Sequence, residues 1–229
     1  MLGLKPVKLM PARERVASAL RKAIISRQIK EGETLALEAT AQELGVSITP
    51  VREAFQILAR DGLLELKQNK GAIVLGVTEK TLRDHYQIRA VLEGYACVLC
   101  VENGADLSAL QNCLKVSEEM IASGDSSRYS DMNQSFHYEI WNASGNEKLV
   151  TMLSELWNGL SMGVQTTERE YAKKSFAEHK EIYEAIAAKD AETARAQMEK
   201  HIRRSLEDML TRYRDCLLYT SPSPRDISG

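Results

Sequence analysis

The chain has 229 residues, of which 44% are hydrophobic, and a formal net charge of −2 at pH 7. This length allows one large domain or two ordinary ones, and this composition is sufficient to bury a core. No apolar run reaches the roughly 18–20 residues that a membrane span needs, and the first 16 residues hold no apolar stretch of signal-peptide length. We therefore expect a cytoplasmic protein with no membrane partner.

The small net charge hides an uneven distribution. Residues 1–78 contain 12 Lys and Arg against 8 Asp and Glu, whereas residues 79–229 contain 18 against 24. A basic first third that precedes an acidic remainder indicates a polyanion partner for the first third only.

The first third has the pattern of three helices followed by a hairpin. Helices are expected over 13–28, over 37–44 and from Ser47 to Gly62, where Ser47 is a capping residue and Gly62 a terminator. Residues 63–68 and 71–77 are strand-like, and the Asn-Lys-Gly between them is a hairpin signal. Because Gly45 also allows a tight turn between the second and third helices, residues 1–77 are predicted to form a winged helix-turn-helix domain.

A domain of this kind places the N-terminal end of its third helix in the major groove of DNA. Ser47 and Thr49 are then candidates for hydrogen bonds to phosphates or bases, and Arg52 for a guanine edge or a phosphate. Lys70 and Gly71 are expected at the wing tip, beside the DNA backbone or the minor groove. The alternative is that Arg52 pairs with a nearby carboxylate on a solvated helix face.

The stretch LGVSITPVREA and the wing sequence NKGA resemble the DNA-binding domain of the GntR family of bacterial transcription regulators. The resemblance covers residues 13–77 and implies a double-stranded DNA partner. Two positions depart from the family pattern: Ile48 stands where a basic residue is common, and Glu38 where an arginine is frequent. Both positions usually face DNA in the family, so these departures concern the affinity and the operator sequence rather than the fold.

From Thr78 onward the periodicity is helical. About six helices are expected, near residues 78–102, 106–123, 126–143, 146–166, 173–188 and 190–213. These helices predict an antiparallel all-α bundle of six to seven helices over residues 78–213, and hence a mainly α protein. The last segment, 214–229, is rich in Ser and Pro and resembles cloning-vector readthrough, so we expect it to be disordered.

Three of the four histidines fall on the apolar faces of three different predicted helices: His137, His179 and His201. In a bundle their rings can converge on a divalent metal, and imidazole suits zinc, nickel, copper or iron. Asn133, four residues before His137, can add an oxygen ligand from the same helix. The alternative is that each ring is a core histidine whose hydrogen bonds are satisfied.

The segments IRAVLEGYA, NQSFHYEIWNASGNEKL, EHKEIYEAI and MEKHI resemble the all-helical C-terminal domain of FadR-type GntR regulators, often called FCD. The resemblance spans residues 79–213. Many members bind a metal through three histidines and one Asp or Asn, which correspond here to Asn133, His137, His179 and His201. The resemblance thus implies a divalent ion, for which zinc and nickel are the expected identities, and the neutral Asn133 is expected to hold it less strongly than the commoner Asp.

Arg89 lies on the apolar stripe of the predicted helix 78–102, where a buried guanidinium needs a partner. One interpretation is a salt bridge to Glu93, four residues further on. The other is a clamp for the carboxylate of an effector whose second oxygen lies on the metal. The resemblance favours the clamp, because the family's effectors are mostly small organic acids. Tyr95 and Trp157 are candidates to close this pocket.

These patterns predict a metabolite-responsive transcription regulator that acts as a homodimer on a pseudo-palindromic operator. The resemblance implies repression that a small organic acid relieves. Two alternatives remain open: the same regulator with a purely structural metal, and a metalloenzyme whose histidines activate water. The second alternative lacks an HExxH-like arrangement and leaves the winged domain unexplained.

Overall fold

The computed structural model describes residues 11–68, 71–124, 129–158 and 169–220. They form two compact units, the first ending at Thr78 and the second beginning at Glu79. Within these residues no helix has the length and the apolar character to cross a membrane.

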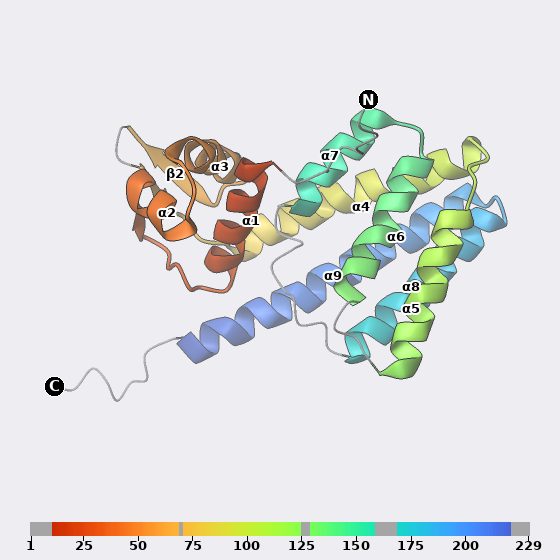
Figure 1. The fold of residues 1–229 in the computed structure, drawn as a ribbon. Helices are drawn as coiled ribbons and strands as arrows, with labels where there is room; N and C mark the ends of the chain where they lie inside the picture. Colours follow the sequence, from red (N-terminus) through yellow and green to blue (C-terminus); the bar gives the residue numbers. More distant parts are fainter. Residues whose placement is uncertain (1–10, 69–70, 125–128, 159–168, 221–229) are drawn as a thin grey trace, which may run out of the picture. The chain divides into compact units, whose positions relative to one another are not determined.

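The first unit combines three helices with a small antiparallel sheet (Figure 1). Its elements are α1 (Ala12–Ile25), β1 (Thr34–Leu35), α2 (Leu37–Leu44), α3 (Ile48–Arg60), β2 (Leu64–Lys67) and β3 (Gly71–Val74). Strand β3 lies between β1 and β2 and pairs with both in antiparallel register. This arrangement confirms the predicted winged helix-turn-helix; strand β1, which has only two residues, was not predicted.

The turn between α2 and α3 follows from its residues. Gly45 ends α2 in the left-handed conformation at φ 63°, which glycine adopts without steric cost. Pro50 lies in the first turn of α3, where its missing backbone donor is not needed. Helix α3 buries one apolar face, formed by Val51, Ala54, Phe55 and Leu58, in the core of the unit, with α1 its main helical neighbour. The opposite face of α3 is therefore left to solvent.

Gly71 opens strand β3 and is required there by the backbone. Its φ is 101°, and a Cβ atom at this position would lie 1.9 Å from the carbonyl oxygen of Leu35 in the paired strand β1. Gly71 was predicted as a DNA-contacting residue at the wing tip. The close approach of β1 is a sufficient physical reason for a glycine here, whether or not DNA is bound.

Replacing Gly71 with alanine is expected to destabilise the first unit severely. The positive φ alone costs roughly 1–3 kcal/mol for an L side chain, and the clash with a backbone carbonyl adds to this cost because the strand must move. Urea unfolding of Gly71→Ala measures the loss. The matched control is Gly32→Ala, which has φ 83° but no atom within 4 Å of the added Cβ. Equal losses for the two variants would contradict the steric explanation.

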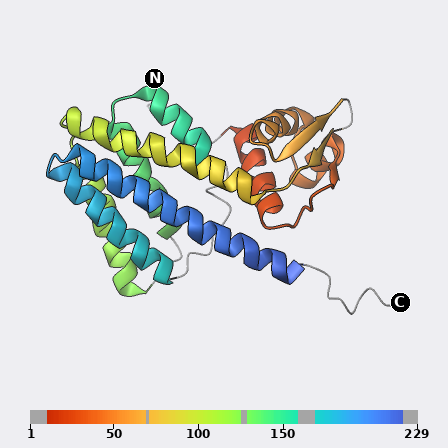
Figure 2. The same ribbon diagram turned by 180° about the vertical axis from the view of Figure 1, so that it is seen from behind.

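The second unit contains helices only (Figures 1 and 2). They are α4 (Glu79–Glu102), α5 (Ser108–Ser123), α6 (Tyr129–Ala143), α7 (Glu147–Asn158), α8 (Arg169–Ala187) and α9 (Ala191–Thr220). Figure 2 shows α4 (yellow) and α9 (blue) side by side. Gly94 permits this approach, since a Cβ there would meet Arg195 and Glu199 of α9 at 3.2 and 3.1 Å. The predicted all-α bundle is confirmed.

Helix α9 continues to Thr220 rather than ending near residue 213. The expectation of a disordered segment from residue 214 is therefore wrong for residues 214–220, whereas residues 221–229 lie outside the described residues. The sequence contains no Pro or Gly between 214 and 220, so nothing in it interrupts the helix. Arg214 also binds Glu79 of α4 through two hydrogen bonds of 2.6 and 2.7 Å.

Candidate metal centre and nucleic-acid interface

The second unit brings the three predicted histidines together in its core. His137 comes from α6, His179 from α8 and His201 from α9, and all three are buried. One ring nitrogen of each lies within 4.8 Å of those of the other two. The nearest pair, the Nε2 atoms of His137 and His201, is 3.2 Å apart. Three imidazoles in this proximity form a potential set of metal ligands.

The hydrogen bonds of the rings determine which nitrogens face the cluster. Nδ1 of His137 lies 2.5 Å from Glu93, and Nδ1 of His201 lies 2.7 Å from Glu178. Because a carboxylate only accepts, each Nδ1 carries the proton and each Nε2 of a neutral ring has a free lone pair. Nε2 of His179 is buried and has no hydrogen-bond partner among the described residues. An unpartnered buried nitrogen beside two further ring nitrogens fits a shared cation.

The pKa values favour the neutral, ligating form of two of the rings, His179 and His201. Burial lowers the pKa of His201 to about 4, although its hydrogen bond to Glu178 opposes this shift. Burial also lowers the pKa of His179 well below its ordinary value, with His201 and His137 adding to the effect. Both rings are therefore uncharged at neutral pH, the state in which imidazole binds metals.

The two carboxylates beside the rings are held in their charged form. Burial tends to raise the pKa of Glu93, but Arg89 and His137 outweigh it, and the net pKa is lowered. Burial likewise opposes ionisation of Glu178, yet its contacts with His201 and Arg204 lower its pKa to about 2. The cluster thus has two negative charges immediately outside its rings.

Asn133 is placed one turn before His137 on α6, as predicted. Its side chain is half-buried, and its Oδ1 accepts a hydrogen bond of 3.3 Å from Ser175 of α8. An amide oxygen is a weaker, neutral ligand compared with a carboxylate, so the donor set of the cluster carries no negative charge of its own.

Arg89 forms the salt bridge to Glu93 that was considered as the alternative to an effector clamp. Its Nε and Nη2 donate to Oε1 of Glu93 at 2.9 and 2.6 Å. The guanidinium also lies over the ring of Trp157 at 4.7 Å, and that ring is 5.0 Å from His137. Trp157 therefore borders the cluster as expected. Tyr95, by contrast, is 48% exposed on the outer face of α4 and does not border it.

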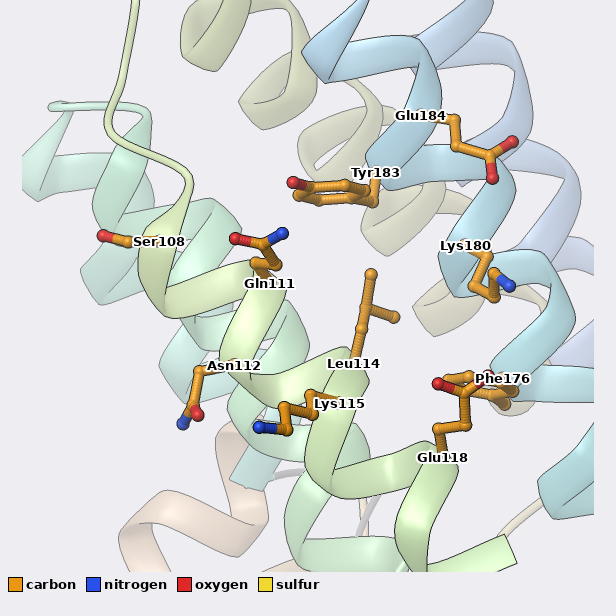
Figure 3. A pocket seen from close by; sticks show the side chains of 10 residues that line it. All are labelled: Ser108, Gln111, Asn112, Leu114, Lys115, Glu118, Phe176, Lys180, Tyr183 and Glu184. Carbon is orange, nitrogen blue, oxygen red and sulfur yellow. The ribbon is translucent and has the colours of Figure 1, made fainter. Parts of the chain in front are cut away.

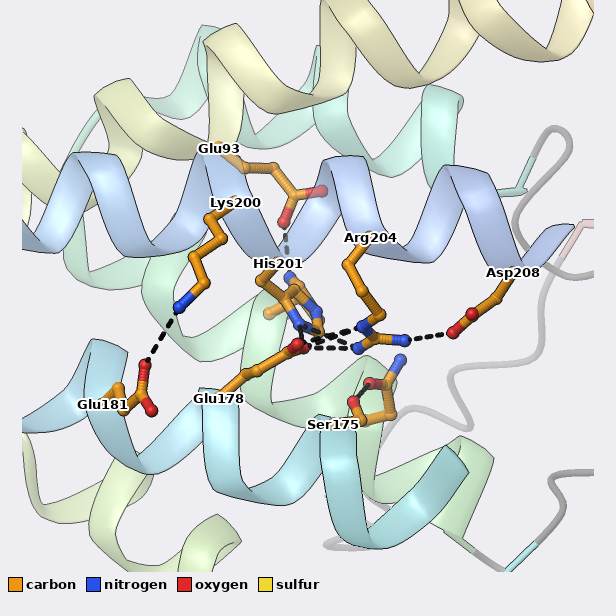
Figure 4. Close-up of polar contacts among 10 residues, drawn as sticks. Glu93, Ser175, Glu178, Glu181, Lys200, His201, Arg204 and Asp208 are labelled. Carbon is orange, nitrogen blue, oxygen red and sulfur yellow. Dashed lines mark hydrogen bonds and ion pairs between the residues drawn. The ribbon is translucent and has the colours of Figure 1, made fainter. Parts of the chain in front are cut away.

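Sequence reasoning missed Glu178 and Arg204. Figure 4 shows Glu178 between His201 and Arg204. Nη2 of Arg204 lies 2.5 Å from Oε2 of Glu178. Glu178 directly precedes His179 in the sequence, which is a local signal that it could lie near the cluster. The histidine that it binds, however, is His201 on α9. Such a pairing across helices depends on how they pack and cannot be read from spacing.

The predicted DNA-binding residues of α3 lie on its exposed side. Ser47, Thr49 and Arg52 are all exposed, and the hydroxyl of Ser47, at the N-cap position, makes no capping hydrogen bond. No ion pair of Arg52 is found within the described part of the chain, so the alternative of a paired surface arginine finds no support. Ile48 and Glu38 are exposed as well. Lys70 lies outside the described residues.

A groove lies between α5 and α8 (Figure 3). Leu114, Phe176 and Tyr183 are among its lining residues. Two lysines and two glutamates also line it: Lys115, Lys180, Glu118 and Glu184. Because these charges balance and no histidine of the cluster lines it, the groove has no particular preference for an acid.

Fold and interface together define a DNA-binding protein of the winged helix-turn-helix class with an all-helical second domain. Two family models match the chain: "Bacterial regulatory proteins, gntR family" over residues 12–74 and "FCD domain" over residues 84–204. The chain belongs to the GntR family of bacterial transcription regulators, in the subfamily with an FCD domain.

The relatives of the chain are transcription regulators. It is 30% identical to the gluconate operon transcriptional repressor of Bacillus subtilis, over 89% of this chain and 86% of the relative. It is 31% identical to the regulator McbR of Escherichia coli, over 73% of this chain and 78% of the relative. The solved structure of E. coli McbR/YncC matches with a TM-score of 0.68 at 25% identity, covering 90% of this chain and 100% of that one. The interpretation as a regulator rather than a metalloenzyme is confirmed.

Proposed function

We propose that the protein is a transcriptional repressor that leaves its operator when a small organic acid binds beside the histidine cluster. The observation that carries this proposal is the buried cluster of His137, His179 and His201, in which one ring nitrogen has no partner in the part of the chain that the structure describes. The gluconate operon repressor, at 30% identity, supports repression and an acid of similar class.

Within this proposal the three histidines and Asn133 hold a divalent ion, with zinc and nickel expected from the imidazole ligands. The bound ion supplies a positive centre for a carboxylate oxygen. Arg89, whose guanidinium is paired with Glu93, lies beside the cluster on α4, and Trp157 forms an apolar wall beside it. The residues of the chain thus favour a compact anion with a carboxylate and exclude neutral apolar molecules.

The operator is proposed to contact the exposed N-terminal end of α3. Ser47 and Thr49 present hydroxyl groups there, and Arg52 presents a guanidinium one turn further along. Two winged units would read two half-sites of a pseudo-palindrome, which requires a homodimer.

An exposed stripe on α4 supports the dimer. Ile88 and Val91 are each 54% exposed and Tyr95 is 48% exposed, so three large apolar side chains face solvent on one helix. Their spacing of three and then four residues is that of a coiled-coil seam, and Val98 continues it. A second copy would bury this stripe against its own equivalent.

Replacing Arg52 with alanine is expected to weaken operator binding. Loss of a bidentate contact to guanine would cost about 1–3 kcal/mol at that base pair alone. Loss of a phosphate contact would weaken all sequences alike and lower the salt dependence by about one ion. Fluorescence anisotropy on an operator selected from random DNA measures both effects. Arg60→Ala, at the far end of α3, is the control, and an equal loss in the two variants would contradict the placement.

The proposed sensing is tested by thermal unfolding after chelation, with and without zinc or nickel, over a panel of small carboxylates. A ligand that binds only the native state raises the melting temperature by mass action. We expect a few acids to stabilise only the metal-loaded protein and to release it from the selected operator. A metal that stabilises the protein while no acid has any effect would favour the purely structural metal.

A further inference from the structure

Two buried or half-buried carboxylates each bind both a histidine of the cluster and an arginine. The first is Glu93 on α4. Its Oε2 accepts hydrogen bonds from Nδ1 of His137 at 2.5 Å and from Nε1 of Trp141 at 3.2 Å. Its Oε1 accepts two more from Arg89. The side chain of Glu93 is fully buried, and both oxygens are engaged on different sides. Its orientation is therefore determined by three neighbours.

The second such carboxylate is Glu178 on α8. Its Oε2 accepts a hydrogen bond from Nδ1 of His201 at 2.7 Å and another from Nη2 of Arg204 at 2.5 Å. Arg204 is itself anchored, because its Nη1 donates to Asp208 at 2.7 Å (Figure 4). Its guanidinium also lies over the ring of Tyr171 at 4.9 Å. The same arrangement of contacts, in which a glutamate binds a histidine and an arginine, thus occurs twice.

We propose that Glu93 and Glu178 are positioning residues of the metal centre, an inference that rests on the proposed metal-dependent function. Each holds the proton on Nδ1 and fixes the plane of one ring, so that His137 and His201 both present Nε2 to the ion. A carboxylate that accepts the outer hydrogen bond also makes the imidazole a stronger donor to a metal.

The third histidine is positioned by different means. The ring of His179 stacks on Phe136 with centroids 4.1 Å apart and an interplanar angle of 14°. Because Asn133 is neutral, the donor set has no charge to balance a divalent ion. Glu93 and Glu178 supply this charge from just outside the ligands, although Arg89 and Arg204 offset part of it.

The experiment compares the zinc affinity of the wild-type protein with that of Glu178→Gln, by competition with a chelator. Glutamine keeps the size and one carbonyl acceptor but loses the charge. We expect the affinity to fall roughly 10–100-fold, the usual cost of losing an outer partner of a metal-bound histidine. Ring ¹⁵N spectra of the metal-free proteins provide a second readout, and we expect the Nδ1-protonated form of His201 to lose population in the variant.

Glu181→Gln is the matched control. Glu181 lies three residues further along α8, is half exposed, and pairs with Lys200 across 3.8 Å rather than with a histidine. The control is expected to keep the wild-type zinc affinity and ring spectra. Glu93→Gln repeats the test on His137, and Glu178→Gln carries the conclusion alone if Glu93→Gln does not fold.

Two failures are distinguishable. If wild-type protein binds no zinc, the metal-dependent function fails and the inference is overturned with it. If wild-type protein binds zinc and folded Glu178→Gln binds it equally well, with only a lower melting temperature, Glu178 is a structural residue and the inference alone is overturned.

Discussion

Replacing His179 with leucine is expected to stabilise the metal-free protein and to abolish its stabilisation by metal. Nε2 of His179 is buried without a partner in the described ranges of the chain, and such a group costs roughly 1–3 kcal/mol. Leucine removes that cost and keeps an apolar contact with Phe136, the ring on which His179 stacks. The same substitution removes one of three imidazoles from the cluster, so bound metal should no longer add the roughly 2.7 kcal/mol that ligand at 100 times its Kd provides.

Chemical unfolding of both proteins, with chelator and with excess zinc, measures the two opposite effects. The control is His85→Leu, because His85 is the one histidine outside the cluster and should leave the response to zinc unchanged. A variant that is less stable than wild type without metal would show that His179 is a satisfied core residue. A variant that still gains stability from zinc would place the metal elsewhere.

The fold could be predicted largely from local signals. Helix α2 was expected over 37–44, where the structure has it, because an apolar pattern ends there at a glycine. Strand β1 has only two residues and is defined by its pairing with β3, so no periodic sequence pattern predicts it. The end of α9 was misplaced because the Ser- and Pro-rich composition of the last 16 residues was applied to its first seven, which are helical.

The convergence of the three histidines could be predicted because polar residues on apolar helix faces stand out in a sequence. Their partners could not, because Glu93 is 44 positions from His137 and Glu178 is 23 positions from His201. Which acid faces which ring is decided by the packing of four helices. Arg89 shows the same limit, since the choice between a salt bridge and a clamp required the position of the carboxylate of Glu93.

Replacing Val91 with aspartate is expected to separate the proposed homodimer and to abolish tight operator binding. Val91 lies at the centre of the exposed stripe on α4, between Ile88 and Tyr95. A charge there would be buried against its own copy across a two-fold axis, with both desolvation and like-charge repulsion opposing association. The monomer should remain folded, because the side chain of Val91 is 54% exposed within one chain. Analytical ultracentrifugation measures the mass, and circular dichroism checks the fold.

The effect on DNA follows from the geometry of two half-sites. A dimer binds its second half-site as an intramolecular event, which raises the overall affinity by roughly 10²–10⁴-fold over that of a single winged unit. Val91→Asp should therefore lose about this factor on the full operator while keeping the weak affinity for an isolated half-site. Leu66→Asp changes another exposed apolar residue, 46% exposed on β2, and serves as the control for mass, since it should stay dimeric. A Val91→Asp protein that remains a dimer would move the interface away from α4, because no stable two-fold contact there accommodates two buried carboxylates.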